Sequence, residues 1–193
     1  MKIFLIRHGQ SESDIEDRYG GDYDDALTVA GQQQVREMAQ GLKDKGIERV
    51  LASPRKRARQ SAEILAQVLD IELEVVDNLR ECNRYGIMTG LEKSQAQAKY
   101  PQLVQMLSNY ATQLPGGEAY VDFRKRVLAS FESIASQPYK TVSIVTHGGP
   151  IRCLLREKLR MGELQDVLDC AVLELRWEDS NITIISDAGI LKN

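Results

Sequence analysis

Hydrophobic and polar positions along the chain alternate between short apolar runs and longer segments in which apolar residues recur every three or four positions. The short runs predict strands at 3–6, 49–52, 71–76, 141–146, 171–177 and 181–186. The longer segments predict amphipathic helices, whose buried stripes are Val35, Met38, Ala39 and Leu42; Ala58, Ala62, Leu65 and Leu69; Phe123, Val127, Phe131 and Ile134; and Ile151, Leu154 and Leu155.

Local signals predict where three of these helices begin. Thr28 is a suitable N-cap, and Gly46 is expected to close the helix that it starts. Ser53 and Pro54 directly follow the second strand, which predicts serine as the N-cap and proline at the first helical position. The Gly-Pro pair at 149–150 is expected to open the last helix.

Strand–helix alternation of this kind predicts an α/β fold with three layers, α/β/α, around a mainly parallel sheet. The first strand is apolar at every position from 3 to 6, which is typical of a strand that is covered on both faces. Residues 78–117 follow a looser pattern, and Tyr100-Pro101 interrupts their helical segment. We therefore expect a single domain over residues 1–193, with an insertion at 78–117 that covers the site.

Length and composition narrow the class of protein. The 193 residues carry 25 Lys and Arg against 28 Asp and Glu, and this charge balance argues against a nucleic-acid-binding protein. No apolar stretch is long enough to cross a membrane or to serve as a signal peptide. The three cysteines form no C-x-x-C pair, and an odd number suits a reducing compartment. We expect a cytoplasmic protein with neither nucleic-acid nor membrane partners.

Basic and imidazole side chains stand directly after three of the predicted strands. Arg7 and His8 follow the first strand, Arg57 lies early in the helix after the second, and His147 follows the strand at 141–146. In an open α/β sheet, ligands bind beyond the carboxyl ends of the strands, where helix N-termini also favour an anion. Guanidinium groups match phosphate oxygens and an imidazole can attack phosphorus. The pattern therefore indicates a phosphoryl-transfer site.

Each of these signals is weak when it is taken alone. An isolated histidine is more often a structural residue than a catalyst. The basic run at 55–59 could equally be a solvated helix face, with Arg57 as one surface charge among several. What favours a site is that all three signals coincide at strand ends.

Taken together, the motifs resemble the histidine phosphatase superfamily, which includes the cofactor-dependent phosphoglycerate mutases. The resemblance runs from residue 2 to residue 160 and implies a phosphoglycerate mutase-like fold. The matching segments are 5–11 (Leu-Ile-Arg-His-Gly-Gln-Ser), 18–21 (Arg-Tyr-Gly-Gly), 24–28, Gly31 with Gln34, 53–62, 79–81 (Leu-Arg-Glu), 115–118 (Pro-Gly-Gly-Glu) and 146–149 (Thr-His-Gly-Gly) with Arg152.

This resemblance implies a role for each catalytic candidate. His8 is the nucleophile and becomes phosphohistidine, while Arg7, Arg57 and His147 surround the phosphoryl oxygens. Glu81 protonates the leaving oxygen and then takes a proton from the attacking water. The family needs no metal, and we expect the protein to use no cofactor. His8 has to be neutral to attack, and we expect the two neighbouring arginines to lower its pKa; burial should help Glu81 to keep its proton.

The resemblance also implies substrate contacts at Gly20, Gly21 and Gly148, and at position 14. Position 14 carries aspartate where the family usually has an asparagine that donates a hydrogen bond to phosphate. A carboxylate at Asp14 would repel a phosphate dianion unless it is protonated or turned outward. Cys82, next to the predicted acid, is interpreted as a passive small residue rather than a redox-sensitive thiol.

Three functions remain open at this point. We favour a phosphatase that hydrolyses a small phosphate monoester, because so short a chain has little cover to protect phosphohistidine from water. The segment 84–93 instead resembles the mutases, which makes a 2,3-bisphosphoglycerate-dependent phosphoglycerate mutase the alternative. A weakly active phosphate-binding module is the second alternative, because of Asp14. The partner is a small phosphorylated metabolite of undetermined identity, and a homodimer is one of the assemblies that the sequence allows.

Overall fold

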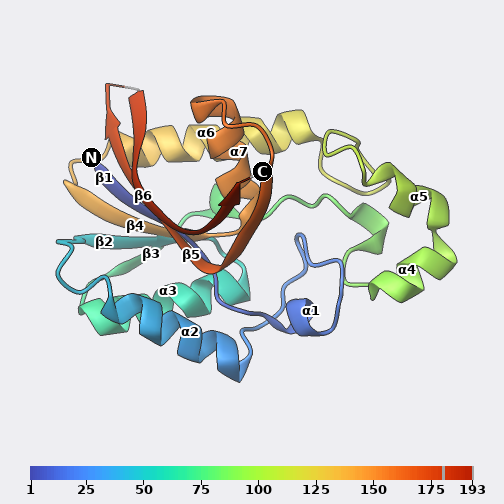
Figure 1. The fold of residues 1–193 in the computed structure, drawn as a ribbon, viewed down its shortest axis with the longest axis horizontal. Coiled ribbons are helices and arrows are strands. Elements are labelled where there is room, and N and C mark those ends of the chain that lie inside the picture. The colour runs from blue at the N-terminus through green and yellow to red at the C-terminus, as the bar shows by residue number, and fades with distance from the viewer. Residues whose placement is uncertain (180, 193) are drawn as a thin grey trace.

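The sheet that organises the molecule has six strands in the order β3-β2-β4-β1-β5-β6. It is seen in a computed structural model that describes residues 1–179 and 181–192 (Figure 1). The strands are β1 (Lys2–Arg7), β2 (Arg49–Ala52), β3 (Leu73–Val75), β4 (Thr141–Thr146), β5 (Leu164–Glu178) and β6 (Asn181–Lys192). The pairs β3–β2, β2–β4 and β4–β1 are parallel, whereas β1–β5 and β5–β6 are antiparallel.

Alternate side chains of the central strand β1 enter two separate hydrophobic layers. Ile3 and Leu5 pack in a cluster with α6 (Tyr120–Ala135) and α7 (Gly148–Leu159). Phe4 and Ile6 pack on the opposite face with α2 (Val29–Gln40) and α3 (Lys56–Leu69). All four side chains are at most 2 % exposed, as expected for a strand covered on both faces. The predicted three-layer α/β/α fold is therefore confirmed (Figure 1).

The antiparallel part of the sheet is larger than the sequence predicted. Strands were expected at 171–177 and 181–186, but β5 already begins at Leu164 and β6 continues to Lys192. The register of this pair shifts between Val167 and Val172, and Cys170 has a positive φ of 54°. Such irregularities break the apolar alternation by which a strand is recognised in sequence.

Two helix boundaries also differ from the prediction. Thr28 does cap α2, where its hydroxyl accepts a hydrogen bond from the Gly31 amide at 2.9 Å, but the helix ends at Gln40 rather than near Gly46. The N-cap of α3 is Arg55, so the helix starts two residues after Pro54. The Ser53 hydroxyl that was expected to cap this helix bonds to the distant His147 instead.

Segment 78–117 lies beyond the end of the sheet at which β1 finishes (Figure 1). It holds most of the short 3₁₀ helix η1 (Asp77–Leu79), all of η2 (Gly86–Met88), and the helices α4 (Lys93–Lys99) and α5 (Pro101–Met106). A small core of its own joins Met88, Ala96 and Leu114 to Tyr19. Another short helix, α1 (Glu12–Ile15), interrupts the polar stretch after β1. No helix in the described part of the chain is long and apolar enough to span a bilayer.

Candidate active site

The ends of β1 and β4 bring both histidines together. These strands are parallel neighbours, and the His8 amide donates to the Thr146 carbonyl at 3.0 Å. The ring centroids of His8 and His147 consequently lie 5.1 Å apart, with one ring edge-on to the other. From the first turn of α3, Arg57 donates through Nε to His8 Nε2 at 3.0 Å. The convergence of three strand ends that the sequence predicted is therefore observed.

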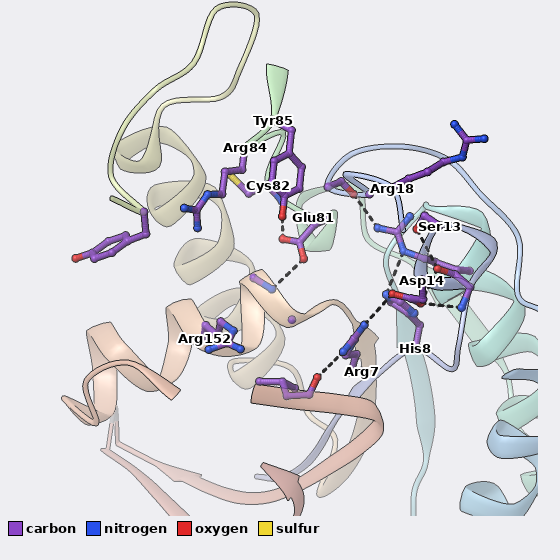
Figure 2. Close-up of a pocket in the computed structure, with 18 of the residues that line it drawn as sticks. Arg7, His8, Ser13, Asp14, Arg18, Glu81, Cys82, Arg84, Tyr85 and Arg152 are labelled. Carbon is purple, nitrogen blue, oxygen red and sulfur yellow. Dashed lines mark hydrogen bonds and ion pairs between the residues drawn. The ribbon is translucent and has the colours of Figure 1, made fainter. Parts of the chain in front are cut away.

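A cavity of about 350 Å³ opens at this point (Figure 2). Eight of the nine predicted site residues line it: Arg7, His8, Asp14, Gly20, Gly21, Arg57, Glu81 and Gly148. The ninth, His147, is 0 % exposed and packs against the ring of His8.

The hydrogen bonds of His8 determine which of its ring nitrogens is free to react. Nδ1 lies 2.8 Å from the Gly9 carbonyl oxygen, which can only accept, so the proton is on Nδ1 and the lone pair is on Nε2. Burial lowers the pKa of His8 well below its ordinary 6.5, and the charges of Arg57 and Arg7 lower it further. The two arginines act as expected, but burial is the larger cause. His8 is thus a neutral imidazole whose Nε2 faces the guanidinium of Arg57.

Arg57 is almost completely buried, and its guanidinium is held in place by four acceptors. Besides the bond to His8, Nη1 donates to Asp25 Oδ1 at 2.7 Å and to the Tyr23 carbonyl at 2.5 Å, and Nη2 donates to the Gly21 carbonyl at 2.7 Å. The Asp25 carboxylate is itself only 3 % exposed. Burial raises the pKa of Asp25, but Arg57 and Ser13 outweigh this effect and lower it overall. Asp25 therefore remains ionised beside Arg57.

Arg7 is shared between a carbonyl and two carboxylates. Nη1 donates to the Val167 carbonyl at 2.5 Å, while Nη2 lies 3.1 Å from Asp169 Oδ1 and 3.4 Å from Asp14 Oδ1. The other oxygen of Asp14 accepts from the amide and the hydroxyl of Ser11, at 2.8 Å each. Asp14 is therefore not turned outward but points at Arg7 from the cavity wall. An incoming phosphate has to compete with both carboxylates for this arginine.

His147 is fixed from behind by Ser53. Its Nε2 lies 2.7 Å from the Ser53 hydroxyl oxygen, which accepts a hydrogen bond from the Arg55 amide at 3.3 Å. We therefore assign the hydroxyl proton of Ser53 to the bond with Nε2 of His147. Nδ1 is buried and has no partner among the described residues. Burial lowers the pKa of His147 well below 6.5, followed by the charges of Arg57 and His8. A neutral ring with its proton on Nδ1 satisfies these contacts, and leaves that N–H unpaired.

Glu81 faces the cavity from the segment after η1. Its Oε2 accepts from the Gly149 amide at 2.9 Å and its Oε1 from the Cys82 amide at 2.7 Å (Figure 2). Both bonds favour the carboxylate, yet burial outweighs them and raises the pKa of Glu81 above its ordinary 4.5. The pKa of the Cys82 thiol is also raised, by burial and by the charge of Glu81, which keeps this thiol protonated and unreactive.

Arg126 holds the backbone of the segment that ends at Glu81. It donates to the carbonyls of Asn78, Arg80 and Glu81 at 2.8, 2.8 and 3.0 Å, and binds both oxygens of Glu118 at 2.6 and 2.7 Å. The largely buried guanidinium of Arg126 thus fixes the segment that carries Glu81. The sequence did not predict this role, because 45 residues separate Arg126 from Glu81.

Comparisons with known proteins agree with this geometry. Residues 3–186 match the family described as Histidine phosphatase superfamily (branch 1). The chain belongs to this superfamily. It is 31 % identical over 194 residues to a "Probable phosphoglycerate mutase GpmB" of Shigella dysenteriae serotype 1, an alignment that covers 93 % of this chain and 86 % of the relative.

Solved structures of the superfamily share the fold of this member. A mycobacterial glucosyl-3-phosphoglycerate phosphatase is 25 % identical, with a TM-score of 0.80 and coverage of 95 % of this chain and 96 % of that one. The same enzyme in complex with VO3 gives a TM-score of 0.82. Bacillus stearothermophilus YhfR, at 23 % identity, gives a TM-score of 0.85 over 95 % of each chain, which shows the fold alone.

Besides Arg126, three side chains that position the site of this superfamily member escaped the sequence analysis: Asp25, Ser53 in its contact with His147, and Asp169. Asp25 lies inside the matched segment 24–28, which was the one available signal, but nothing there indicated that it pairs with Arg57. Asp169 had no signal, because it reaches Arg7 only through the pairing of β1 with β5. Burial and the charge of the neighbouring carboxylates raise the pKa of Asp169, against the effect of Arg7.

Gly149 offers a direct way to displace the candidate acid. A Cβ at this position would lie 1.9 Å from Glu81 Oε1, whose carboxylate sits at the end of a flexible side chain and can rotate away. We expect Gly149→Ala to fold normally and to reduce kcat by about 10²-fold, because general acid catalysis is worth roughly 10²- to 10⁴-fold. Steady-state rates on an unactivated phosphate ester measure the effect. Gly41→Ala is the matched control, since its nearest neighbour would be a carbonyl oxygen at 3.4 Å, and an equal loss in both variants would contradict the assignment.

Proposed function

We propose that this superfamily member is a phosphatase that hydrolyses a small phosphate monoester through a phosphohistidine on His8. The observation that carries the proposal is a neutral imidazole with its lone pair on Nε2, at the wall of a cavity that Arg7 and Arg57 also line. A buried nucleophile that is uncharged, and that stands among guanidinium groups, suits attack on a phosphoryl group. Glucosyl-3-phosphoglycerate phosphatase activity in a structural neighbour supports the hydrolytic direction.

In the first step of the proposed reaction, Nε2 of His8 attacks phosphorus and the bond to the leaving alcohol breaks. Arg57 Nε now donates to Nε2, so this N–H has to exchange to a phosphoryl oxygen as the substrate binds. Glu81 gives its proton to the leaving oxygen, which departs as a neutral alcohol. The raised pKa of Glu81 keeps that proton available above the ordinary 4.5.

In the second step, water attacks phosphorus, Glu81 takes a proton from it, and the N–P bond breaks to regenerate neutral His8 and release phosphate. The unpaired Nδ1–H of His147 is suited to donate to a phosphoryl oxygen, because buried polar groups generally find a partner. Gly148, at the N-terminus of α7, adds a helix end that favours an anion, and Gly20 and Gly21 line the same cavity. In the proposed reaction, these groups stabilise the negative charge of the phosphoryl group.

A phosphoglycerate mutase is the alternative, favoured by the GpmB relatives and by Tyr85 and Lys93 of the mutase-like segment, which line the cavity. A mutase has to keep water from its phosphohistidine, which requires more cover than the two short helices of segment 78–117 provide. The second alternative is a binding module of low activity, for which the hold of Asp14 and Asp169 on Arg7 is the specific observation.

One experiment separates these three functions. The protein is incubated with phosphorylated metabolites, quenched in alkali and weighed intact, while free phosphate is assayed in parallel. The phosphatase gives a phosphoryl adduct on His8 together with released phosphate. A mutase converts 3-phosphoglycerate to its isomer, in the presence of 2,3-bisphosphoglycerate, without releasing phosphate. Neither adduct nor turnover, despite measurable binding of the ester, would replace the proposal with a binding module.

The two opposed pKa shifts predict a bell-shaped pH profile of kcat/KM. Because the pKa of His8 is lowered, protonation removes the nucleophile only well below pH 6.5, which sets the acid limb. Because the pKa of Glu81 is raised, loss of its proton above pH 4.5 sets the alkaline limb. Glu81→Gln cannot titrate, so we expect it to lower the rate and to lose the alkaline limb. A wild-type profile that stays flat between about pH 4 and 8 would contradict both roles.

A further inference from the structure

The backbone that carries Glu81 is held by side chains rather than by a helix or a strand. Glu81 lies between η1 and η2, in a stretch without regular secondary structure. The four consecutive carbonyls of residues 78–81 each accept a hydrogen bond from a distant side chain. Three of these bonds come from Arg126 and one comes from Thr146. Backbone carbonyls outside regular structure need other partners, and here two side chains supply all four.

Thr146 ties this stretch to the nucleophile. Its side chain is completely buried at the end of β4, and its Oγ1 donates to the Leu79 carbonyl at 2.7 Å. Its own carbonyl accepts from the His8 amide at 3.0 Å. Three residues further along, the Gly149 amide donates to the Glu81 carboxylate itself. The end of β4 and the start of α7 therefore hold both the nucleophile and the candidate acid.

Arg126 holds the same stretch from helix α6. Its guanidinium carries five N–H groups, and all five are in hydrogen bonds: three to the carbonyls of residues 78, 80 and 81, and two to the carboxylate of Glu118. The guanidinium carbon also lies 4.9 Å from the centroid of the Phe123 ring. No N–H remains to bind a substrate, and neither Arg126 nor Thr146 is among the described residues that line the cavity. Either side chain can therefore affect the reaction only through the backbone that it holds.

A general acid has to lie within about 3 Å of the oxygen that it protonates, and an error of about 1 Å can lower the rate about 10²-fold. Figure 2 shows Glu81 and His8 apart from one another on the cavity that both line, so their spacing depends on the backbone behind them. We infer that Thr146 and Arg126 are positioning residues, which set the distance between Glu81 and His8 so that both reach one phosphate ester. The inference rests on the proposed phosphatase activity and concerns the protonation of its leaving group.

Two esters of similar size separate a displaced acid from a general loss of structure. The anion of 2,4-dinitrophenol leaves without a proton, whereas phenolate leaves slowly unless it is protonated. The comparison uses kcat/KM, which covers only the steps up to departure of the phenol. We expect Thr146→Val, which keeps the shape of the side chain but lacks the hydroxyl, to lower kcat/KM about 10-fold on phenyl phosphate and at most about 2-fold on 2,4-dinitrophenyl phosphate. Arg126→Met loses every one of its hydrogen bonds, so its loss on phenyl phosphate should be about 100-fold, with a similarly small effect on the dinitrophenyl ester.

Ser143→Ala is the matched control for Thr146→Val. The Ser143 hydroxyl is also fully buried in β4, but it has no hydrogen-bond partner among the described residues. Its removal should leave both rates unchanged. Thr146→Ser restores a hydroxyl and should recover most of the loss on phenyl phosphate. If Arg126→Met does not fold, the variants of Thr146 decide the question alone.

The outcomes distinguish a failure of this inference from a failure of the proposed function. An equal loss on both esters in Thr146→Val, or a full rate on both, would overturn the inference and leave the phosphatase standing. A loss that Thr146→Ser does not restore would overturn it as well, since the hydroxyl would not be its cause. Failure of the wild type to hydrolyse even the dinitrophenyl ester would instead refute the phosphatase.

Discussion

His8→Ala is expected to lower phosphatase turnover by about 10⁴-fold or more, because losing the nucleophile removes the covalent route altogether. The residual rate would come from the binding of the substrate and the charges of Arg7 and Arg57. The variant should also show no phosphoryl adduct in intact mass spectra after an alkaline quench. Initial rates on phenyl phosphate and the adduct mass are the two measurements.

The control for this variant has to exclude unfolding as the cause, because His8 is itself buried. His8→Asn keeps a polar side chain at the end of β1, and both variants should unfold cooperatively in urea near the parental midpoint. Turnover of His8→Ala at the parental rate, with the fold intact, would refute the proposed mechanism. A parental rate accompanied by an adduct elsewhere would move the nucleophile to another residue.

Asp25→Ala is expected to lower the free energy of unfolding by about 3–5 kcal/mol, because it leaves the buried charge of Arg57 without its partner. Asp25 and Arg57 are 3 % exposed each, so water cannot replace the lost carboxylate. Activity should fall as well, since Arg57 is no longer held against His8. Urea unfolding monitored by circular dichroism measures the stability.

Asp24→Ala is the matched control, because this neighbouring carboxylate is exposed and only accepts the Lys56 amide at the start of α3. It should cost about 1 kcal/mol, as the loss of a helix cap does. Since the pKa of Asp25 is lowered in the folded protein, its contribution is complete above the ordinary 3.8 and is lost as the pH falls through the folded value. The difference between wild type and Asp25→Ala should therefore shrink below about pH 4, and a difference that grows on acidification would contradict the ion pair.

Local pattern was enough to predict most of the fold. The apolar run at 3–6 and the β-branched run at 141–146 form β1 and β4, because an apolar strand without polar positions has to be covered on both faces. The stripe at Ala58, Ala62 and Leu65 is fully buried, as helical spacing predicts. The ends of β5 were not predictable, since pairing with β6 through irregular registers stabilises a stretch whose side chains do not alternate.

The amino-acid sequence by itself determined which residues stand at the strand ends, and hence that Arg7, His8 and Arg57 would meet in one pocket, because strand ends are set by local apolar runs. Only the tertiary structure decided how these groups are charged and oriented. Arg57 is paired with Asp25 across 32 residues, and His147 bonds to Ser53 across 94. Such contacts depend on the order of the strands in the sheet and on side-chain positions that are set to within a few tenths of an ångström. Neither the strand order nor these positions can be read from periodicity along the chain.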